Sequence, residues 1–316
     1  MSTKETVPVF FAVNDPYAAA LGVAIKSLTA NANPDRQYQL IILNQGLRPE
    51  HVKKIKQLAT PNVSIDFESM AAKIQECLSD NNNTLRADYF TLTIYYRLFI
   101  AEMFPEIKRA VYIDADVIVL DDIGKLYDTD LQGNMIGAAL DPVIGTDALM
   151  SNYSRNAVGV PAERYVNSGV LLMDLQQLRQ RDFAGHFLNL LNTYHFNSIA
   201  PDQDYINAIA TDRMFIIDSK WDVENGELAG TKLIHYNLYQ KPWRYAGMKG
   251  EEAFWKYAPA TPFNDELRAN LAIYDTPEHH QEDDQHFKDL LARADRIAAE
   301  TGTFHEVQEQ TGKVRL

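Results

Sequence analysis

The sequence is almost free of cysteine and is short of basic residues. Cys77 is the only cysteine among 316 residues, so an intramolecular disulfide and a cysteine-based zinc site are both excluded. Thirty Lys and Arg stand against 43 Asp and Glu, which gives a net charge of −13. This balance argues against nucleic acid as a general partner, because phosphate backbones need a basic surface. A small phosphate ligand held by a local cation and a metal stays open.

Long apolar runs are also missing. No window approaches about 18 apolar residues without charge, so we expect no transmembrane segment. The opening residues, MSTKETVPVFFAVNDPYAAA, lack the basic start and long apolar core of a signal peptide. We therefore expect a cytoplasmic protein; a peripheral position at the inner face of the membrane stays open. The hydrophobic content of 46% is ordinary for a globular protein and allows a sizeable core.

The sequence alternates short apolar runs with helical patterns. The apolar runs predict strands at residues 7–13, 38–44, 63–69, 110–123, 135–141, 214–223 and 232–237. Helices are predicted at residues 17–32, 48–59, 91–104 and 282–301. Residues 165–180 are predicted to begin as a strand and continue as a helix, and residues 79–88 to form a loop. The alternation is typical of an α/β protein with a mixed, mostly parallel sheet flanked by helices. We expect one domain over residues 1–245 and a small helical extension over 246–316.

A pair of acids stands inside the apolar stretch AVYIDADVIVLDDI, residues 110–123. Asp114 and Asp116 are two residues apart and therefore point to the same side of an extended chain. Ligands of open α/β sheets collect at the carboxyl ends of the strands, and paired carboxylates suit Mg²⁺ or Mn²⁺. The alternative is an ordinary turn, with Asp114 capping residues 121–126 and Asp116 solvated.

A histidine and a lysine follow the last predicted strand in KLIHYNLYQKPWR, residues 232–244. His235 comes directly after the apolar run, and a neutral imidazole is a good ligand for Mn²⁺. Lys241 lies six residues later, and its ammonium group can neutralise a departing diphosphate. A histidine in this position can also be structural.

Taken together, these motifs resemble glycosyltransferase family 8, the retaining family that includes bacterial galactosyl- and glucosyltransferases of lipopolysaccharide synthesis and glycogenin. The resemblance runs from about residue 7 to residue 244. It is carried, in order, by FFAVNDPYAAALGVAIKSL, YYRLF, YIDADVIV, VNSGVLLMDL, PDQDYIN and HYNLYQKPW. The acid pair alone is a weak signal, whereas the whole series in this order is a specific one.

The resemblance implies a GT-A nucleotide-binding fold, a UDP-sugar donor, Mn²⁺ or Mg²⁺, and an α-linked product. Asp114, Asp116 and His235 match the metal ligands of the family, and Lys241 matches its diphosphate-contacting lysine. The remaining matches on the nucleotide side are Ala12, Asn14, Tyr17 and Ala115. There Tyr17 would stack on uracil and Asn14 would meet its edge. Tyr17 can alternatively be a core residue.

The resemblance also implies a sugar side. Residues facing the donor sugar would be Arg97, Asn167, Ser168, Gly169, Asp202 and Gln203, and Asp141 would face the acceptor. Among these, Asp202, Gln203 and Arg97 are the expected catalytic residues. Gln203 is a poor nucleophile because its amide is neutral, whereas Asp202 beside it is a carboxylate. The sequence does not choose between a covalent intermediate and attack on the face of departure; we favour the latter, with Gln203 stabilising the cation. Two structural alternatives stay open: Asp202 as the N-cap of a helix over 203–210, and Arg97 as a helix residue paired to any acid.

The sequence departs from the family pattern at three places. Bacterial relatives often have Asp where this chain has Asn14, and the family's glycine within the His-to-Lys segment is Leu238 here. A leucine with φ above zero would be strained. Residues 278–300 are acidic, whereas lipopolysaccharide-type relatives end in basic segments that bind the membrane. This favours a soluble or protein-bound acceptor, although saccharide, glycolipid and glycoprotein acceptors all stay open.

Three functions are consistent with these residues. The first is a metal-dependent hexosyltransferase that uses UDP-glucose or UDP-galactose, between which the sequence does not choose. The second is a protein of the same fold that binds a nucleotide sugar without turnover. The third is a sugar nucleotidyltransferase, which would need a glycine-rich, basic phosphate loop after the first strand; NDPYAAAL has neither glycine nor lysine there.

Overall fold

The computed structural model describes residues 6–70, 92–224, 226 and 229–316, so the predicted loop at 79–88 lies outside the described residues. The chain is divided into two compact units, each assembled from three stretches of sequence. The first contains residues 1–73, 110–130 and 219–281, and the second contains residues 74–109, 131–218 and 282–316.

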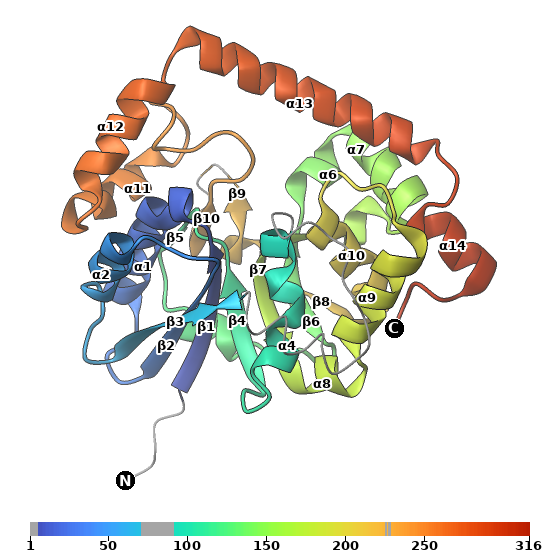
Figure 1. Cartoon of the computed structure of the whole chain (residues 1–316), viewed down its shortest axis with the longest axis horizontal. Helices are drawn as coiled ribbons and strands as arrows, with labels where there is room; N and C mark the ends of the chain where they lie inside the picture. Colours follow the sequence, from blue (N-terminus) through green and yellow to red (C-terminus); the bar gives the residue numbers. More distant parts are fainter. Residues whose placement is uncertain (1–5, 71–91, 225, 227–228) are drawn as a thin grey trace. The chain divides into compact units, whose positions relative to one another are not determined.

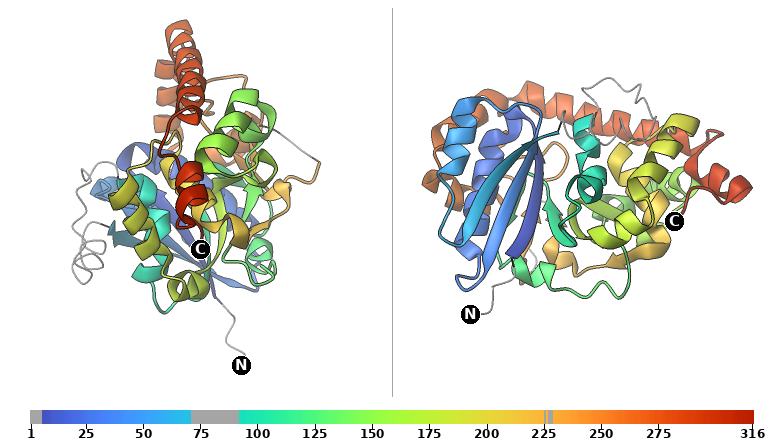
Figure 2. Two further views of the ribbon diagram at one scale, coloured as in Figure 1. Left: turned by 90° about the vertical axis from the view of Figure 1, so that its right-hand side faces the viewer. Right: turned by 60° about the horizontal axis from the view of Figure 1, so that its bottom comes forward.

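The first unit is built on parallel strands in the order β3-β2-β1-β4. Its strands are β1 (Thr6–Val13), β2 (Gln37–Asn44), β3 (Val63–Ser69) and β4 (Arg109–Ile113). The connections are η1 (Asp15–Tyr17), α1 (Ala18–Asn31) and α2 (Pro49–Lys56). Strands β1–β3 lie side by side in Figure 2, with α1 and α2 behind them in its right-hand view. These elements confirm the predicted β-α-β-α-β order.

The stretch predicted as one strand over residues 110–123 is in fact two strands. β4 ends at Ile113, and β5 (Val117–Val119) pairs with β10 (Leu233–His235) in a separate three-stranded sheet that is completed by β9 (Val223–Glu224). The side chain of Asn31 and the hydroxyl of Ser27, both on α1, bond the backbone of Val119 at 2.9 Å. Sequence pattern missed the break because every residue around the acid pair is apolar enough for a strand.

The residues after 245 contribute helices to the first unit. They are α11 (Glu251–Tyr257), η7 (Ala258–Ala260) and α12 (Asn264–Tyr274). Asn31 donates to the Tyr257 hydroxyl at 3.0 Å, and the buried Phe263 ring lies against Gly22 on α1. Figure 1 shows α11 and α12 close to α1. The domain boundary at residue 245 stays a prediction.

The second unit contains three strands in the order β7-β6-β8. β6 (Ile136–Leu140) runs antiparallel to β7 (Val166–Asp174) and parallel to β8 (Met214–Ile216). The other pairings described in the seven-stranded sheet, β1 with β2, β1 with β4 and β2 with β3, are parallel, so the mixed, mostly parallel character that we predicted is confirmed. The strand predicted at 214–223 is wrong in extent, because it is divided into β8, η6 (Ser219–Trp221) and the start of β9.

Helices surround the strands of the second unit, as Figure 1 shows for α8, α9 and α10. They are η2 (Leu92–Phe99), α4 (Ile100–Met103), α6 (Pro142–Thr146), α7 (Ala148–Tyr153), η3 (Ser154–Val158), η4 (Ala162–Arg164), α8 (Leu175–Gln180), α9 (Phe183–Tyr194), α10 (Pro201–Ala210), η5 (Thr211–Arg213) and α14 (Phe304–Thr311). The single helix predicted at 91–104 is therefore wrong, because most of it is the 3-10 segment η2. Over so few turns, apolar spacing does not separate about 3.0 from about 3.6 residues per turn.

Two further helices complete the part of the chain that the structure describes. α5 (Gly124–Tyr127) follows β5 in the first unit, and α13 (Pro277–Ala298) begins in the first unit and ends in the second. The helix predicted at 282–301 is thus confirmed, with an earlier start. Within the residues that the structure describes, no helix combines the length and the apolar character that crossing a membrane would require.

Candidate functional site

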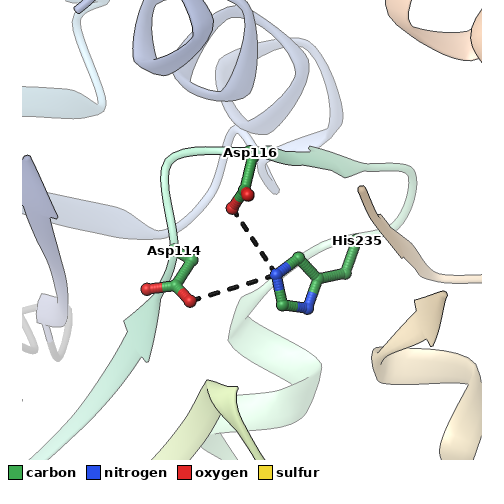
Figure 3. A group of neighbouring side chains, drawn as sticks. All are labelled: Asp114, Asp116 and His235. Atoms are coloured by element: carbon green, nitrogen blue, oxygen red, sulfur yellow. Dashed lines mark ion pairs between the residues drawn. The ribbon is translucent and has the colours of Figure 1, made fainter. Parts of the chain in front are cut away.

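The acid pair lies directly beyond the carboxyl end of β4, where ligands of open α/β sheets collect. Asp114 and Asp116 lie in the turn between β4 and β5, and His235 is the last residue of the neighbouring β10. Figure 3 shows the three side chains converging from these separate segments. Antiparallel pairing of His235 with Val117 fixes the histidine beside the turn that carries both acids.

The three side chains have the spacing of a metal site. One ligand atom from each residue lies within 4.8 Å of the other two. His235 Nε2 lies 3.9 Å from Asp114 Oδ2 and 3.5 Å from Asp116 Oδ1. Two ligands of an octahedral ion with bonds of about 2.1 Å are separated by about 3 Å when adjacent and about 4.2 Å when opposite. These residues therefore fit one Mn²⁺ or Mg²⁺ ion with little movement.

A residue that sequence reasoning missed holds the imidazole in place. Asp222 Oδ1 lies 3.0 Å from His235 Nδ1, and both side chains are buried. A carboxylate on the far ring nitrogen is the usual partner of a metal-binding histidine, because it directs the other nitrogen at the ion. Burial lowers the pKa of His235, but Asp222 and Asp116 outweigh it and raise that pKa well above 6.5. The pocket therefore favours positive charge beside its acids.

Lys241 lies against the same acid pair. Lys241 is 3% exposed. Its ammonium group pairs with Asp116 and donates to the backbone carbonyl of Tyr236. Burial raises the pKa of Asp116, but the charge of Lys241 and a hydrogen bond from His235 bring it below its ordinary value of 3.8. Asp116 is thus ionised, which is the state in which a carboxylate can bind a metal ion.

The predicted uracil-binding segment follows β1. Ala12 lies near the end of β1, Asn14 is exposed, and Tyr17 is partly exposed with its ring edge-on to Trp243 at 6.1 Å. Tyr17 is therefore not a core residue, and the segment is joined to the Lys241 segment through Trp243. Ala115 is buried between the two acids.

Buried polar contacts hold this segment in place. Asp15 accepts from the Arg48 backbone N–H at 2.8 Å and from its guanidinium at 2.6 Å. The His51 ring, 1% exposed, bonds the same carboxylate at 2.9 Å. Asp15 therefore ties the turn after β1 to the start of α2, and sequence reasoning had assigned it no role.

The residue that replaces the family's glycine has the backbone conformation of a glycine. Leu238 has φ of 53°, in the left-handed region, and is 37% exposed. Leu238 therefore has the backbone conformation in which a leucine is strained, and such a conformation costs a non-glycine residue about 1 kcal/mol or more.

A second group of predicted residues converges within the second unit. Arg97 pairs with Asp202 at 3.1 Å, and its guanidinium donates to the Ser168 carbonyl at 2.6 Å. The Ser168 hydroxyl in turn donates to Asp202 at 3.1 Å. Arg97 and Ser168 are buried, so the ion pair joins η2, β7 and α10. Arg97 is thus paired with Asp202, another residue predicted on the sugar side.

Gln203 and Asp141 extend this group. The Ser168 backbone N–H donates to Gln203 Oε1 at 2.9 Å, and Gln203 Nε2 donates to Asp141 Oδ2 at 2.9 Å. Asp141 is buried and also caps α6 by accepting from the Ile144 N–H. Asn167 is buried and bonds the Gly169 N–H at 2.7 Å. All predicted sugar-side residues therefore lie in one cluster of the second unit.

Two structural alternatives from the sequence are wrong. The N-cap of α10 is Ala200, so Asp202 lies inside the first turn and its carboxylate is directed to Arg97 and Ser168. Asp114 does not cap α5; Asp122 bonds the Gly124 N–H there at 2.9 Å, and Asp114 accepts from Tyr112.

Comparison with known proteins assigns the family. The family model described as "Glycosyl transferase family 8" matches residues 8–247, about three quarters of the chain. The chain belongs to glycosyltransferase family 8. The resemblance read from its motifs is thereby confirmed, and the protein is a glycosyltransferase.

Several curated bacterial proteins are similar to this family 8 member. General stress protein A of Bacillus subtilis is 25% identical over 267 residues, which cover 77% of this chain and 89% of the relative. Lipopolysaccharide 1,2-glucosyltransferase of Escherichia coli is 24% identical, covering 82% of this chain and 79% of the relative. A putative glycosyltransferase of Haemophilus influenzae is 24% identical, covering 69% of this chain and 64% of the relative.

Solved structures show the fold. The bifunctional glycosyltransferase WbbM matches with a TM-score of 0.73 and 22% identity, covering 85% of this chain and 52% of its own. The galactosyltransferase LgtC, solved with donor and acceptor sugar analogues, matches with a TM-score of 0.66 and 24% identity, covering 84% of this chain and all of its own. The family 8 chain thus has the predicted GT-A fold.

Proposed function

We propose that this family 8 glycosyltransferase is a metal-dependent, retaining hexosyltransferase. It transfers glucose or galactose from a UDP-sugar to an acceptor and forms an α-glycosidic bond. The observation that carries the proposal is the convergence of Asp114, Asp116 and His235 in the first unit of a family 8 chain. Two carboxylates and an imidazole are a donor set for Mn²⁺ or Mg²⁺, and such ions commonly bind substrate phosphates as well.

The nucleotide-side roles belong to the first unit. A bound divalent ion would supply positive charge to the diphosphate that leaves the sugar. Lys241 would add a second positive charge there, because its ammonium already lies against Asp116. Tyr17 would stack on uracil and Asn14 would contact its edge; both are accessible to solvent. Ala12 and Ala115 would line the same site.

The sugar-side roles belong to the second unit. Arg97, Asp202 and Gln203 are the proposed catalytic residues, with Asn167, Ser168 and Gly169 beside them on the donor sugar and Asp141 on the acceptor. The sugar would carry positive charge as its bond to the diphosphate breaks, as in glycoside hydrolysis. Both ends of the Gln203 amide are already hydrogen-bonded, which favours a polar role over a nucleophilic one.

Relatives support a hexose donor. One similar protein is named as a glucosyltransferase of lipopolysaccharide and one similar structure as a galactosyltransferase. A saccharide, glycolipid or glycoprotein would be the acceptor. The acidic segment 278–300 favours a soluble or protein-bound one, because a basic tail for an anionic membrane is lacking there.

Calorimetry of UDP binding tests the metal-dependent half of the proposal. We expect UDP to bind with Mn²⁺ and to lose most of its affinity with EDTA or in Asp116→Ala. Asp121→Ala is the matched control, because it removes a carboxylate from the same segment. That carboxylate pairs with Lys125 and not with the residues of the proposed metal site. Equal affinity in all conditions would refute the metal assignment.

Product analysis tests the transfer itself. Proton NMR of sugar released or transferred from UDP-glucose and UDP-galactose reports the anomeric configuration through its coupling. We expect the α-anomer first; an initial β product would exclude retention. Binding without any product would indicate the non-catalytic alternative. Stabilisation by a sugar 1-phosphate with a nucleoside triphosphate, and not by UDP, would indicate a nucleotidyltransferase.

A further inference from the structure

The acid that ends the PDQD motif is buried beneath the sugar-side cluster. Asp204, fully shielded from solvent, accepts hydrogen bonds from Tyr153 at 2.6 Å and Tyr165 at 2.5 Å. The Ser198 hydroxyl and the Ala200 backbone N–H also donate to it. Burial raises the pKa of Asp204, and the hydroxyl groups oppose that rise by bonding the ionised form. A buried acid with so many directed donors needs a reason beyond packing.

Tyr165 connects this acid to Gln203. Burial and the charge of Asp204 raise the pKa of Tyr165 well above its ordinary value. The phenol therefore keeps its proton, and its hydroxyl donates a hydrogen bond to Asp204. The oxygen of the same phenol then faces Gln203 Nε2 as an acceptor at 3.4 Å. Donation therefore runs from the Gln203 amide to the Tyr165 oxygen and from the Tyr165 hydroxyl to Asp204.

The consequence is a single orientation of the Gln203 amide. Its NH₂ group faces two acceptors, the Tyr165 oxygen and Asp141 Oδ2, and its carbonyl faces the donating Ser168 N–H. Rotating the amide by half a turn would place an oxygen against two acceptors and an NH₂ against a donor. Such a rotation would lose all three hydrogen bonds of the amide and bring like groups together against buried partners, which is costly.

We propose that Asp204 and Tyr165 are positioning residues that hold the Gln203 amide in the orientation used for sugar transfer. The inference rests on the proposed function, because it takes Gln203 as a residue that faces the donor sugar. Neither positioning residue needs to touch the sugar. They act through the hydrogen bond from the Gln203 amide to the Tyr165 hydroxyl. Removing that bond changes the orientation of the Gln203 side chain and leaves the proposed nucleotide-binding residues of the first unit intact.

The structure supplies a matched control in Tyr153. Both phenols donate to Asp204, both are fully buried, and each loses one hydroxyl on substitution by Phe. The second contact of the Tyr153 hydroxyl is the Ile199 backbone N–H, whereas that of the Tyr165 hydroxyl is Gln203. A purely structural role of the network predicts similar defects from both changes. A positioning role predicts a defect in turnover from only one of them.

Steady-state kinetics with the preferred UDP-hexose tests this difference. We expect Tyr165→Phe to lower kcat by about tenfold and to leave the donor KM within about twofold, whereas Tyr153→Phe keeps kcat within about twofold at similar thermal stability. Asp204→Asn should lower kcat as well. The double variant with Tyr165→Phe should be no worse than Asp204→Asn alone, since both act through one bond. Equal kcat losses in Tyr153→Phe and Tyr165→Phe would overturn the proposal.

A readout that needs no turnover separates this inference from the proposed function. The side-chain amide signals of Gln203 in the ¹H–¹⁵N NMR spectrum can be assigned by their loss in Gln203→Glu. We expect them to shift clearly in Tyr165→Phe and far less in Tyr153→Phe. If the wild-type protein transfers no sugar but these shifts appear, the proposed function fails and the network stands. Unchanged signals in Tyr165→Phe would refute the network in either case.

Discussion

At the scale of single residues, the structure adds Asp222 to the site predicted from the sequence. Asp222 bonds His235 Nδ1 and thereby leaves Nε2 directed at Asp114 and Asp116. We expect Asp222→Asn to weaken Mn²⁺-dependent UDP binding by about 10- to 100-fold, because an amide orients the imidazole less well and lacks the charge that makes it basic. Calorimetry measures this change.

The control for this prediction is Asp121→Asn, which makes the same substitution at an acid paired with the exposed Lys125. It should bind UDP as the wild type does. Full UDP affinity in Asp222→Asn would show that the Asp222 carboxylate has no part in metal binding. A residual UDP affinity in EDTA that is lower in Asp222→Asn than in the wild type would indicate a folding defect instead.

Glu102 on α4 carries an unfavourable buried charge. Its Oε2 atom is buried and has no hydrogen-bond partner among the described residues. Burial raises the pKa of Glu102 from 4.5 to about 7. Because the folded-state pKa exceeds the unfolded one, the favourable contribution of the protonated form is complete below pH 4.5 and is lost as the pH rises through about 7.

We therefore expect Glu102→Gln to gain stability relative to the wild type as the pH rises from about 4.5 to above 7, by up to about 3 kcal/mol. Urea unfolding at a series of pH values measures the difference. Glu106→Gln makes the same change at an exposed position nearby and serves as the control. A stability difference that is constant with pH would contradict a raised pKa at Glu102.

At the scale of elements, the packing of α12 on α1 depends on one glycine. A Cβ atom at Gly22 would lie 2.4 and 2.7 Å from carbons of the Phe263 ring, and both residues are buried. We expect Gly22→Ala to destabilise the protein by about 1–3 kcal/mol, even though alanine favours helix more than glycine does. Thermal or urea unfolding measures the loss.

Two variants make this prediction specific. Gly145→Ala on α6 adds the same methyl group where nothing lies within 4 Å, so it should be neutral or stabilising. In a Phe263→Leu background, Gly22→Ala should cost less, because the smaller side chain leaves room for the new carbon. An equal cost of Gly22→Ala in both backgrounds would exclude the Phe263 ring as its cause.

At the scale of the whole molecule, the residues after 245 are part of the first unit up to residue 281. Phe254 packs on Trp243 with ring centroids 5.2 Å apart, and the Tyr236 hydroxyl bonds the Gly250 carbonyl at 2.6 Å. Both contacts hold the segment that carries His235 and Lys241. A domain that ended at the predicted boundary would lack them.

We therefore expect a chain that ends at residue 245 to lose Mn²⁺-dependent UDP binding and cooperative unfolding. A chain that ends at Asp275 keeps α11 and α12 and should retain both properties better. Calorimetry and urea unfolding of the two truncated chains measure the difference. Equal UDP binding by both would show that the extension is separable, as the sequence alone suggested.

The sequence by itself determined the family, the fold class and most of the site. The acid pair lies within one apolar run, the histidine ends another, and the lysine lies six residues after it; their order along the chain matches one family. Local patterns of this kind depend on residues a few positions apart, which is what a sequence displays directly. For Leu238 the sequence showed only that a leucine stands where the family has a glycine, and the structure gave its φ of 53°.

Only the tertiary structure decided which distant side chains complete the site. Asp222 meets His235 because β9 and β10 pair in parallel, and Tyr165 meets Asp204 because α10 packs on β7. The break of the predicted strand at Asp114 likewise depends on β10 pairing with β5. These contacts arise from strand pairing and packing between segments far apart in sequence, and no local pattern of apolar and polar residues encodes which partners will meet.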